Sequence, residues 1–537
     1  MDYDFIIIGA GSAGCVLADK LTETGRHKVL LLEAGGSDLR FWVQVPLGYG
    51  RTINDPSVNW MFRTEPDAGL GGVADYWPRG KVLGGSSSIN AMVFIRGNPA
   101  DYDDWAAAGN LGWAWSDVLP VFRAIEDNEG GASDFRGVGG KLHVSDVSEQ
   151  LHPLARIYLK GAREAGLAIN PDLNGPMQEG AGLYQLTTKN GRRMSSARAF
   201  LKPARRRNNL HIETGALATR LLIENGRAVG VEYRQHGQIR TERAGREVIV
   251  ASGSVNSPQL LQLSGIGPGE LLQSLGIPVV TGNANTGAHL QDHLGINFTY
   301  RSKIPTLNSV LRPWWGKLWA GMQYVFARRG PLSLSLNQAG GFFRTSPDLV
   351  RPNMQLYFQA ISTLTAQKGS RPLLNPDPFE AFSLGLSSCR PTSRGSIMIR
   401  SADPTVQPAI NANAFATGHD IEEMLAAVKF LRKLADTPSL SAVIAEELAP
   451  GPACQSDDDL IADIRARSGT VYHPVGTCRM GPDASSAVVD ARLCVHAVGG
   501  LRVVDCSIMP NIISGNTNAA AIMIGAKGAQ MILEDAR

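Results

Sequence analysis

Cysteine is scarce in this chain, with six residues among 537, at positions 15, 389, 454, 478, 494 and 506. They form no Cys-x-x-Cys pair and have no histidine at zinc-ligand spacing, so the pattern predicts no metal site. Scattered cysteines of this kind are typical of reduced thiols in an intracellular protein. The N-terminus passes directly into an apolar stretch and a glycine turn, without the features of a signal peptide. We therefore expect a cytoplasmic location.

The sequence also lacks a long hydrophobic run and an excess of one charge. No uninterrupted apolar stretch reaches the roughly 18 residues of a membrane-spanning helix, so we expect peripheral membrane contact at most. Lysine and arginine number 52 against 49 aspartates and glutamates, a formal charge of +3. Such a balance gives no basic field along which a phosphate backbone would bind, so we expect no nucleic-acid partner. The length predicts a large core divided between two or more lobes.

A glycine-rich turn lies near the N-terminus, between an apolar run at residues 4–8 and apolar residues at helical spacing after position 14. The turn itself reads Gly-Ala-Gly-Ser-Ala-Gly over residues 9–14. A second buried-type strand over residues 28–32 ends at Glu33, close to the ~20-residue separation expected of a dinucleotide-binding unit. The pattern therefore predicts strand, tight turn, helix and strand within the first 35 residues.

Each glycine of this turn has a physical role in binding a dinucleotide. Gly9 permits the turn, Gly11 lets the backbone approach a pyrophosphate, and Gly14 lets the helix pack close to the strand. Glu33 can accept hydrogen bonds from both ribose hydroxyls and would repel a 2′-phosphate, which disfavours NADP. This unit alone does not separate FAD from NAD.

The middle of the chain predicts further strands and one aromatic helix. Residues 210–231 alternate strand-like runs with turns at Thr214-Gly215 and Asn225-Gly226, as a small inserted sheet would. Residues 311–326 carry a strongly apolar helical face, made of Trp314, Trp315, Leu318, Trp319, Met322 and Phe326. We expect ordinary packing of this face against the core. A membrane-facing or lid role is the alternative, because exposed tryptophan-rich faces occur at such sites.

Three further segments are rich in glycine, serine and asparagine. They are GKVLGGSSSIN at 80–90, GSVNSP at 253–258 with LSGIG at 263–267, and the C-terminal pair HPVGTCRMG at 473–481 and GNTNA at 515–519. In this order after the N-terminal turn, they resemble the signature segments of the glucose-methanol-choline (GMC) oxidoreductases. The resemblance spans the chain from one end to the other. It implies a flavin-dependent enzyme that oxidises alcohols.

The resemblance also implies the fold class, a mixed α/β chain with two lobes. We expect a Rossmann-like FAD-binding lobe and a substrate-binding lobe built on an antiparallel sheet with flanking helices. The cofactor motifs occur at both chain ends and are missing from the middle, so each lobe is discontinuous. The predicted FAD-binding domain comprises residues 1–145, 190–293 and 495–537. The predicted substrate-binding domain comprises residues 146–189 and 294–494.

The expected cofactor is non-covalently bound FAD. By resemblance, its contacts lie in the N-terminal unit, the loop near residue 90 and four later positions: Gly9, Gly11, Ser12, Ala13, Gly14, Glu33, Ala34, Val82, Gly84, Asn90, Ala91, Met92, Val93, Ala218, Tyr472, Asp505 and Ala519. The loop around Gly84 exposes many N–H groups and suits a pyrophosphate or a flavin edge, with a surface linker as the alternative. Some relatives join FAD covalently to a histidine in this loop, where the present chain has Ile89. We expect the helix after Ala251 to support the fold without a chemical role.

Two residues near the C-terminus are the candidates for chemistry. Oxidising an alcohol requires a base for the hydroxyl proton, and a histidine, with an ordinary pKa of about 6.5, suits that task. A single histidine is usually structural, and an asparagine after glycine is often a turn residue. The resemblance favours catalysis for both: His473 takes the proton, Asn516 donates to the oxygen, and hydride passes to flavin N5.

The substrate is less directly encoded than the cofactor. Relatives that oxidise choline carry a glutamate just after a Gln-Asp-His segment, whereas here residues 291–294 are followed by Gly295. We therefore expect a neutral primary alcohol, oxidised to the aldehyde, with a quinone or another carrier accepting the electrons. The alternatives are an oxidase that uses O₂, a non-redox hydroxynitrile lyase or a light-driven fatty-acid decarboxylase of the same family, an NAD-dependent enzyme and a non-catalytic flavin-binding module.

Overall fold

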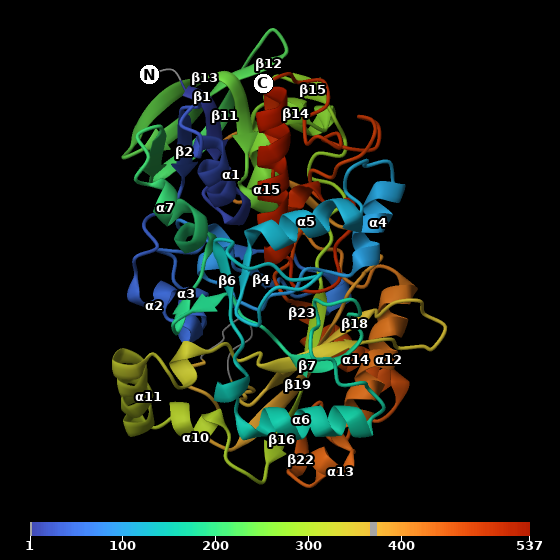
Figure 1. Cartoon of the computed structure of the whole chain (residues 1–537). Coiled ribbons are helices and arrows are strands. Elements are labelled where there is room, and N and C mark those ends of the chain that lie inside the picture. The colour runs from blue at the N-terminus through green and yellow to red at the C-terminus, as the bar shows by residue number, and fades with distance from the viewer. Residues whose placement is uncertain (1–2, 366–372) are drawn as a thin grey trace.

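Two seven-stranded sheets organise the chain (Figure 1). The computed structural model describes residues 3–365 and 373–537. The strands of the first sheet, in the upper half of the view, come from residues 3–33, 210–250 and 501–503. Those of the second sheet, in the lower half, come from residues 180–183 and 294–470. This mixed α/β architecture is the fold class that the sequence predicts.

The first sheet begins with the predicted strand–helix–strand unit: β1 (Tyr3–Ile8), α1 (Ser12–Thr22) and β2 (Val29–Glu33). Three more strands lie parallel in the order β10-β2-β1-β13-β24: β10 (Leu210–Thr214), β13 (Gln238–Val250) and β24 (Leu501–Val503). The side chains of β1 and β2 are buried on both faces, which accounts for their uninterrupted apolar runs. Helix α1 packs beside α15 (Asn518–Asp535), so the two ends of the chain meet (Figure 1).

Strand β13 joins the parallel and antiparallel parts of this sheet. Its residues 244–250 pair with β1, and its residues 238–243 pair with β12 (Arg227–Gln235). Strand β11 (Ala216–Glu224) then completes the antiparallel part. Gly215 and Gly226 lie at the predicted turns with φ of +64° and +73°. The inserted antiparallel strands are therefore confirmed, although they extend the main sheet and do not form a separate one.

The second sheet is antiparallel, in the order β22-β16-β19-β18-β17-β7 with β23 beside β16. Its strands are β7 (Gly180–Leu183), β16 (Leu294–Ser302), β17 (Ala339–Phe343), β18 (Met354–Gln359), β19 (Ala381–Ser388), β22 (Ile444–Ala449) and β23 (Gly469–Thr470). Helices α6 (Pro153–Glu164) and α12 (Gly418–Ala435) pack against one face. In β18, Leu356 and Phe358 join that core, whereas Tyr357 and Gln359 line a cavity on the other face.

The two lobes share part of their core. Val45, Leu47 and Tyr49 lie near the N-terminus, yet they belong to the same buried cluster as β16 and β18. The short helix α2 (Phe41–Gln44) precedes these residues, and Tyr49 begins helix α3 (Tyr49–Thr52). The exact bounds of the two domains stay a prediction.

Helix α11 (Trp314–Ala327) corrects one expectation. The predicted helix forms, but its aromatic face does not pack against the core: Trp314 is 75% exposed and Phe326 is 84% exposed. The helix contacts the protein through the opposite side, where Gly316, Ala320 and Tyr324 are buried. Small residues let that side approach closely, so the large side chains are left outside. In residues 3–365 and 373–537, no helix has the length and apolarity needed to cross a bilayer.

Candidate active site

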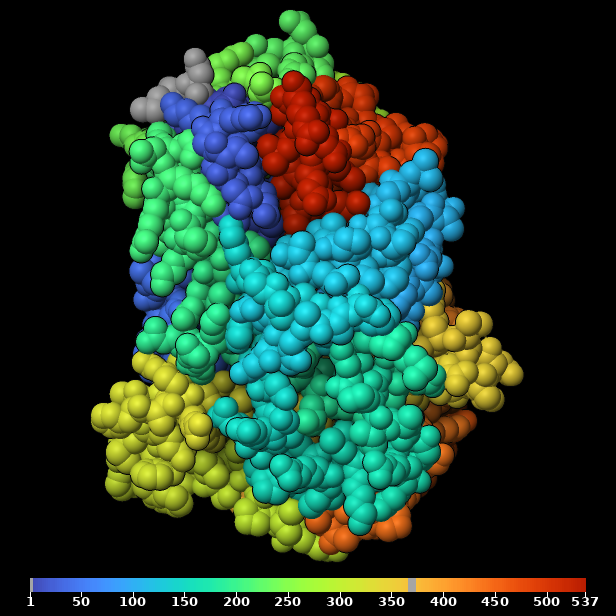
Figure 2. Space-filling view, viewed as in Figure 1, coloured from blue at the N-terminus to red at the C-terminus, as the bar shows by residue number. Residues whose placement is uncertain are grey.

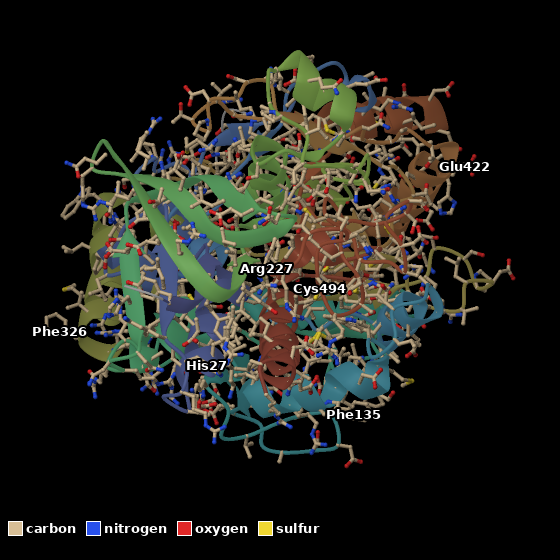
Figure 3. The ribbon with its side chains drawn as sticks, turned by 90° about the horizontal axis from the view of Figure 1, so that it is seen from above. His27, Phe135, Arg227, Phe326, Glu422 and Cys494 are labelled. Carbon is tan, nitrogen blue, oxygen red and sulfur yellow. The ribbon has the colours of Figure 1, made fainter. Side chains whose placement is uncertain are left out.

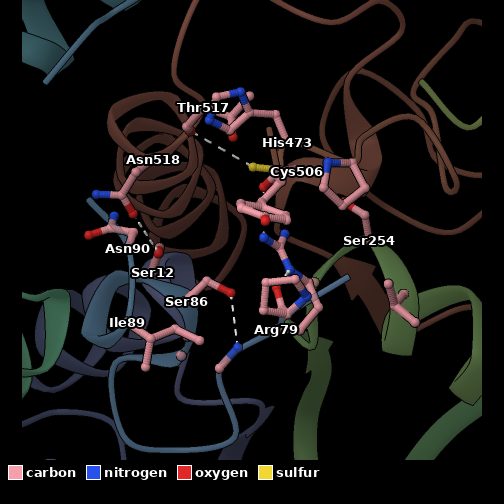
Figure 4. A pocket seen from close by; sticks show the side chains of 18 of the residues that line it. Ser12, Arg79, Ser86, Ile89, Asn90, Ser254, His473, Cys506, Thr517 and Asn518 are labelled. Atoms are coloured by element: carbon pink, nitrogen blue, oxygen red, sulfur yellow. Dashed lines mark hydrogen bonds between the residues drawn. The ribbon is translucent and has the colours of Figure 1, made fainter. Parts of the chain in front are cut away.

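A cavity of about 440 Å³ lies between the two sheets. Its lining joins the glycine turn of β1–α1 at one end to β16 and β18 at the other. The close view in Figure 4 shows Ser12 and Asn518 on one side of it and His473 on another. The Ser12 hydroxyl donates a 2.8 Å hydrogen bond to Oδ1 of Asn518, which ties the first turns of α1 and α15 together.

Glycines shape the end of the cavity beside the β1–α1 turn, which we call the nucleotide end because the sequence predicts a dinucleotide there. Gly9 has a φ of +103°, and a Cβ on Gly14 would lie 1.9 Å from the Gly9 carbonyl oxygen. A Cβ on Gly85 would lie 2.7 Å from the Cα of Gly11, so the two glycine loops touch. Side chains at these positions would fill the space or push the loops apart.

Three helices begin at the cavity, and this arrangement tests whether FAD fits. Residues at the N-terminal ends of α1, α8 (Gly253–Leu263) and α15 line it, and none of the three helices has an acidic residue in its first turn. Backbone N–H groups and the helix dipole at such ends favour a bound anion. The glycine loops and the three helix ends therefore suit the pyrophosphate of FAD.

Glu33 lines the nucleotide end of the cavity, where the sequence predicts contact with a ribose. Its two carboxylate oxygens accept hydrogen bonds from the backbone N–H groups of Ala10 (2.9 Å) and Gly35 (2.8 Å). Burial raises the pKa of Glu33 to about 7, although those two N–H groups and Lys81 act in the opposite direction. The carboxyl group is thus held in place facing the cavity, where a pair of ribose hydroxyls could donate to it.

Most of the predicted cofactor residues line this one cavity. They are Gly9, Gly11, Ser12, Ala13, Glu33, Ala34, Asn90, Ala91, Met92, Val93, Ala218, Tyr472 and Asp505. Four others, Gly14, Val82, Gly84 and Ala519, are not part of the lining. Gly14 packs against the glycine turn, and Gly84 donates its N–H to the carbonyl of Ala10 at 2.7 Å. Val82 and Ala519 are buried in the core.

Helix α8 contributes more than we expected from its sequence. Residues 252–256 line the cavity, although the sequence suggests only a supporting role. Asp505 holds this helix end, because its Oδ2 accepts from the Gly253 N–H at 2.8 Å and from the Ser257 hydroxyl. The Asp505 carboxylate therefore fixes the backbone of α8 where it meets the cavity.

The two candidate catalytic residues meet at the other end of the cavity. Nε2 of His473 lies 3.3 Å from Nδ2 of Asn516, and both residues line the cavity. The backbone N–H of His473 donates to Oδ1 of Asp292 at 2.7 Å. Arg79 donates to the carbonyl oxygen of Tyr472 at 2.7 Å. The loop that carries the imidazole is thus anchored on both sides.

Sequence reasoning missed two residues that hold this pair. His293 lies behind His473, with 3.0 Å between the two Nδ1 atoms, and its Nε2 lies 3.0 Å from the Cys389 carbonyl oxygen. Gln355, on β18, donates from Nε2 to Oδ1 of Asn516 at 3.1 Å. His293 belongs to the Gln-Asp-His segment, which we used only to predict the substrate and not to predict a role for this histidine. Gln355 has no local motif.

Both histidines are neutral around pH 7. Burial, the neighbouring His293 and Arg79 hold the pKa of His473 well below its ordinary value. Burial is also the main cause that lowers the pKa of His293 to about 4. Burial raises the pKa of Asp292 to about 7, against hydrogen bonds from Thr470 and the His473 backbone. A neutral imidazole has a free nitrogen lone pair, as a general base requires.

Gly295 follows this segment and leaves no room for a side chain. A Cβ there would lie 2.8 Å from Cγ1 of Val471 and 2.9 Å from the Leu386 carbonyl oxygen. The position belongs to β16, where Gly295 pairs with Ser387 of β19. A carboxylate at this point of the cavity would therefore require the neighbouring strand to move.

Comparison with known proteins gives full-length matches. The family models for the N- and C-terminal parts of GMC oxidoreductases match residues 3–295 and 391–525. The chain is 43% identical to "Alcohol dehydrogenase [acceptor]" of Pseudomonas putida, over 99% of this chain and 96% of the relative. It is 41% identical to the mitochondrial choline dehydrogenase of Homo sapiens, over 99% of this chain and 90% of the relative.

Two solved structures superpose on this chain over nearly its whole length. Pyridoxine 4-oxidase from Mesorbium loti superposes with a TM-score of 0.89 at 31% identity, covering 98% of this chain and 99% of that one. A formate oxidase superposes with a TM-score of 0.92 at 26% identity, covering 99% of this chain and 98% of that one.

Proposed function

The chain belongs to the GMC oxidoreductase family, flavin-dependent enzymes that act on CH–OH groups, and from this we propose that it oxidises a neutral primary alcohol to the aldehyde. The observation that carries the proposal is the placement of a neutral His473 beside Asn516 in the cavity whose other end suits FAD. When bound, FAD supplies the acceptor for the hydride that leaves the alcohol carbon.

The hydrogen bonds of His293 determine which nitrogen of His473 is the base. The Cys389 carbonyl can only accept, so Nε2 of His293 carries its proton and its Nδ1 has the lone pair. Nδ1 of His473 must then be the N–H that donates to Nδ1 of His293. This leaves the lone pair of His473 on Nε2, the atom beside Asn516. His293 is therefore a positioning residue that selects the reactive tautomer.

A second set of hydrogen bonds orients Asn516. Gln355 donates to Oδ1 of Asn516, and the Tyr357 hydroxyl donates to Oε1 of Gln355 at 2.7 Å. The amide oxygen of Asn516 is thereby engaged, and its NH₂ group faces His473. An alcohol oxygen within hydrogen-bond distance of both groups would receive a hydrogen bond from Asn516 while its proton passes to Nε2 of His473.

The lining near His473 supports a neutral substrate. Ile296, Leu386 and Val471 are apolar, and the packing around Gly295 excludes a carboxylate from that position. The charged residues Asp75 and Arg467 also line the cavity, so the argument for a neutral alcohol rests on position 295 alone. There a quaternary ammonium group would lack the counter-charge that a choline-oxidising relative provides. An uncharged alcohol has no such requirement.

The cofactor attachment and the electron acceptor are part of the proposal. Ile89 lines the cavity where some relatives carry the histidine that binds FAD covalently, so we propose dissociable FAD. We propose a quinone or another carrier as acceptor, in agreement with the relative named as an acceptor-linked alcohol dehydrogenase. Direct use of O₂ is the second candidate.

Anaerobic reduction of the bound flavin tests the proposal. Purified enzyme mixed with a panel of primary alcohols is expected to bleach at the flavin absorption maximum, and His473→Ala is expected to bind FAD but stay oxidised. Choline serves as the charged comparison and should bleach slowly or not at all. Cyanide release from a cyanohydrin without bleaching would instead identify a lyase. Turnover with an artificial acceptor compared with O₂ separates dehydrogenase from oxidase.

A further inference from the structure

The outer side of α11 is the largest group of exposed apolar side chains on one element among the described residues. This α11 face consists of Trp314, Trp315, Leu318, Trp319, Met322, Val325 and Phe326. The helix forms a corner of the molecule, at the lower left of the space-filling view (Figure 2), and Phe326 points away from the body in the view from above (Figure 3). A contiguous group of seven exposed apolar side chains is typical of an interaction surface.

The helix is held firmly enough to present this face. Tyr324 is buried beneath it, stacks edge-on with Phe41 at 6.5 Å and lies under the Arg328 guanidinium at 4.8 Å. Arg328 ends the helix with a φ of +54° and donates its N–H back to the Tyr324 carbonyl. The exposed side chains are therefore displayed on a fixed helix, not on a fraying one.

The segment that carries the α11 face has charges of one sign. Residues 305–343 contain no aspartate or glutamate, but they contain Arg312, Lys317, Arg328 and Arg329. Within the part of the chain that the structure describes, none of these four forms a salt bridge. The tryptophans thus lie inside a basic segment without local neutralisation.

We infer that the α11 face docks on an anionic lipid bilayer, with the helix in the plane of the interface. Tryptophan side chains favour the headgroup region, and nearby lysine and arginine side chains gain energy from anionic lipids. Fourteen residues span roughly 21 Å, less than the ~30 Å hydrocarbon core, so the helix lies on the membrane and does not cross it.

The same charges argue against a second copy of the chain as the occupant. A two-fold dimer through this face would bring Lys317 and Arg329 of each copy against the same basic segment of the other. Like charges brought together oppose that association, whereas lipid phosphates complement them. The proposal is independent of the reaction catalysed in the cavity.

Flotation with lipid vesicles tests the proposal on the full-length holoenzyme. One set of vesicles contains phosphatidylglycerol mixed with phosphatidylcholine, and the other contains phosphatidylcholine alone. We expect wild-type protein to float with the first set and to detach as salt is added. Two variants separate the contributions: W315S/W319S removes apolar side chains, and K317E/R329E reverses charge. Each should weaken binding at least about tenfold.

The matched control is Leu111→Ser, because Leu111 is 82% exposed in a loop remote in sequence from α11 and should leave flotation unchanged. All variants should retain bound FAD and turn over a short, water-soluble alcohol with a soluble artificial acceptor at the wild-type rate. Quenching of tryptophan fluorescence by brominated lipid should be strong in the wild type and reduced in W315S/W319S.

Two outcomes would overturn the inference. One is equal flotation of the wild type and both double variants, or no flotation with either lipid composition. The other is a concentration-dependent dimer that W315S/W319S abolishes, seen by sedimentation velocity in protein that binds no vesicles. That result would assign the face to a second copy of the chain.

Discussion

The two ends of the cavity are built in different ways. At the nucleotide end, one continuous stretch from β1 to β2 supplies the glycine turn, the start of α1 and Glu33, and the Gly85 loop and the starts of α8 and α15 complete the lining. At the other end, which we call the alcohol end because the proposed reaction takes place there, His473, Asn516, His293 and Gln355 come from four separate segments and are joined side chain to side chain. The first end depends on local backbone geometry and the second on the packing of the two lobes, so each should be breakable without the other.

The largest effect is expected from Gly14→Val, which targets the nucleotide end. The added Cβ would lie 1.9 Å from the Gly9 carbonyl oxygen, so α1 must move away from the turn. We expect loss of bound FAD and of all activity, measured by flavin absorbance per protein and by turnover. Gly36→Ala is the control, because no atom lies within 4 Å of the position of its Cβ. Full FAD content in Gly14→Val would show that this packing does not form the site.

The next effect in size is expected from His473→Ala, which targets the alcohol end. Removing a positioned base should lower kcat by ~10²–10⁴ while FAD stays bound, since the nucleotide end is untouched. Steady-state kinetics and the flavin spectrum measure the two quantities in the same sample. His419→Ala, an exposed histidine on α12, is the control. Loss of FAD together with activity would contradict the separation of the two ends.

A smaller effect is expected from His293→Leu, which removes the acceptor behind His473. Loss of one hydrogen bond that selects the tautomer should lower kcat about tenfold, with little change in KM. The acid limb of the pH–rate profile should also move to higher pH. His293 is one of the groups that lower the pKa of His473, so its removal raises that pKa. His293→Asn offers an amide oxygen near the Nδ1 position and should restore part of the rate. Equal defects in both variants would indicate a packing role only.

The smallest effect concerns the pH dependence of FAD affinity. In the apoprotein the pKa of Glu33 is raised to about 7, so below that pH the carboxyl group holds a proton that it must release before it can accept from both ribose hydroxyls. FAD should therefore bind more tightly as the pH rises from 6 to 8, by up to about tenfold. Titration of apoprotein with FAD measures this.

Two variants decide whether Glu33 is responsible. Glu33→Gln cannot ionise, so its affinity for FAD should be lower at pH 8 and nearly independent of pH. Glu270→Gln, an exposed position on helix α9 (Gly269–Ser274), should keep the wild-type dependence. An unchanged slope in Glu33→Gln would show that another group titrates.

The difference between the two ends of the cavity also explains which of their residues could be predicted from the sequence. Strand, turn and helix at the N-terminus follow from residues that are neighbours in sequence, and the structure confirms them. His473 and Asn516 were indicated by resemblance, and the structure brings them together. Gln355 was not predicted, because its partner lies 161 residues away and no local pattern marks the pair.

Helix α11 shows a second limit of sequence patterns. The periodicity of its apolar residues predicts the helix correctly. It shows that one side of the helix is more hydrophobic than the other, but not which side packs against the protein. Whether the small side, with Gly316 and Ala320, or the aromatic side meets the protein depends on the neighbouring elements. The small side does so here, and our expectation was wrong for that reason.

Gly295 has a consequence for how this chain could change over generations. An acidic residue there would collide with Val471, whose side chain mutation can shrink, and with the carbonyl oxygen of Leu386, which no codon change removes. A single mutation therefore gives a misfit rather than a new specificity, and its benefit appears only after β16 and β19 have separated slightly. If the proposed preference for uncharged alcohols holds, the Leu386 carbonyl oxygen would oppose its loss by a single mutation at position 295.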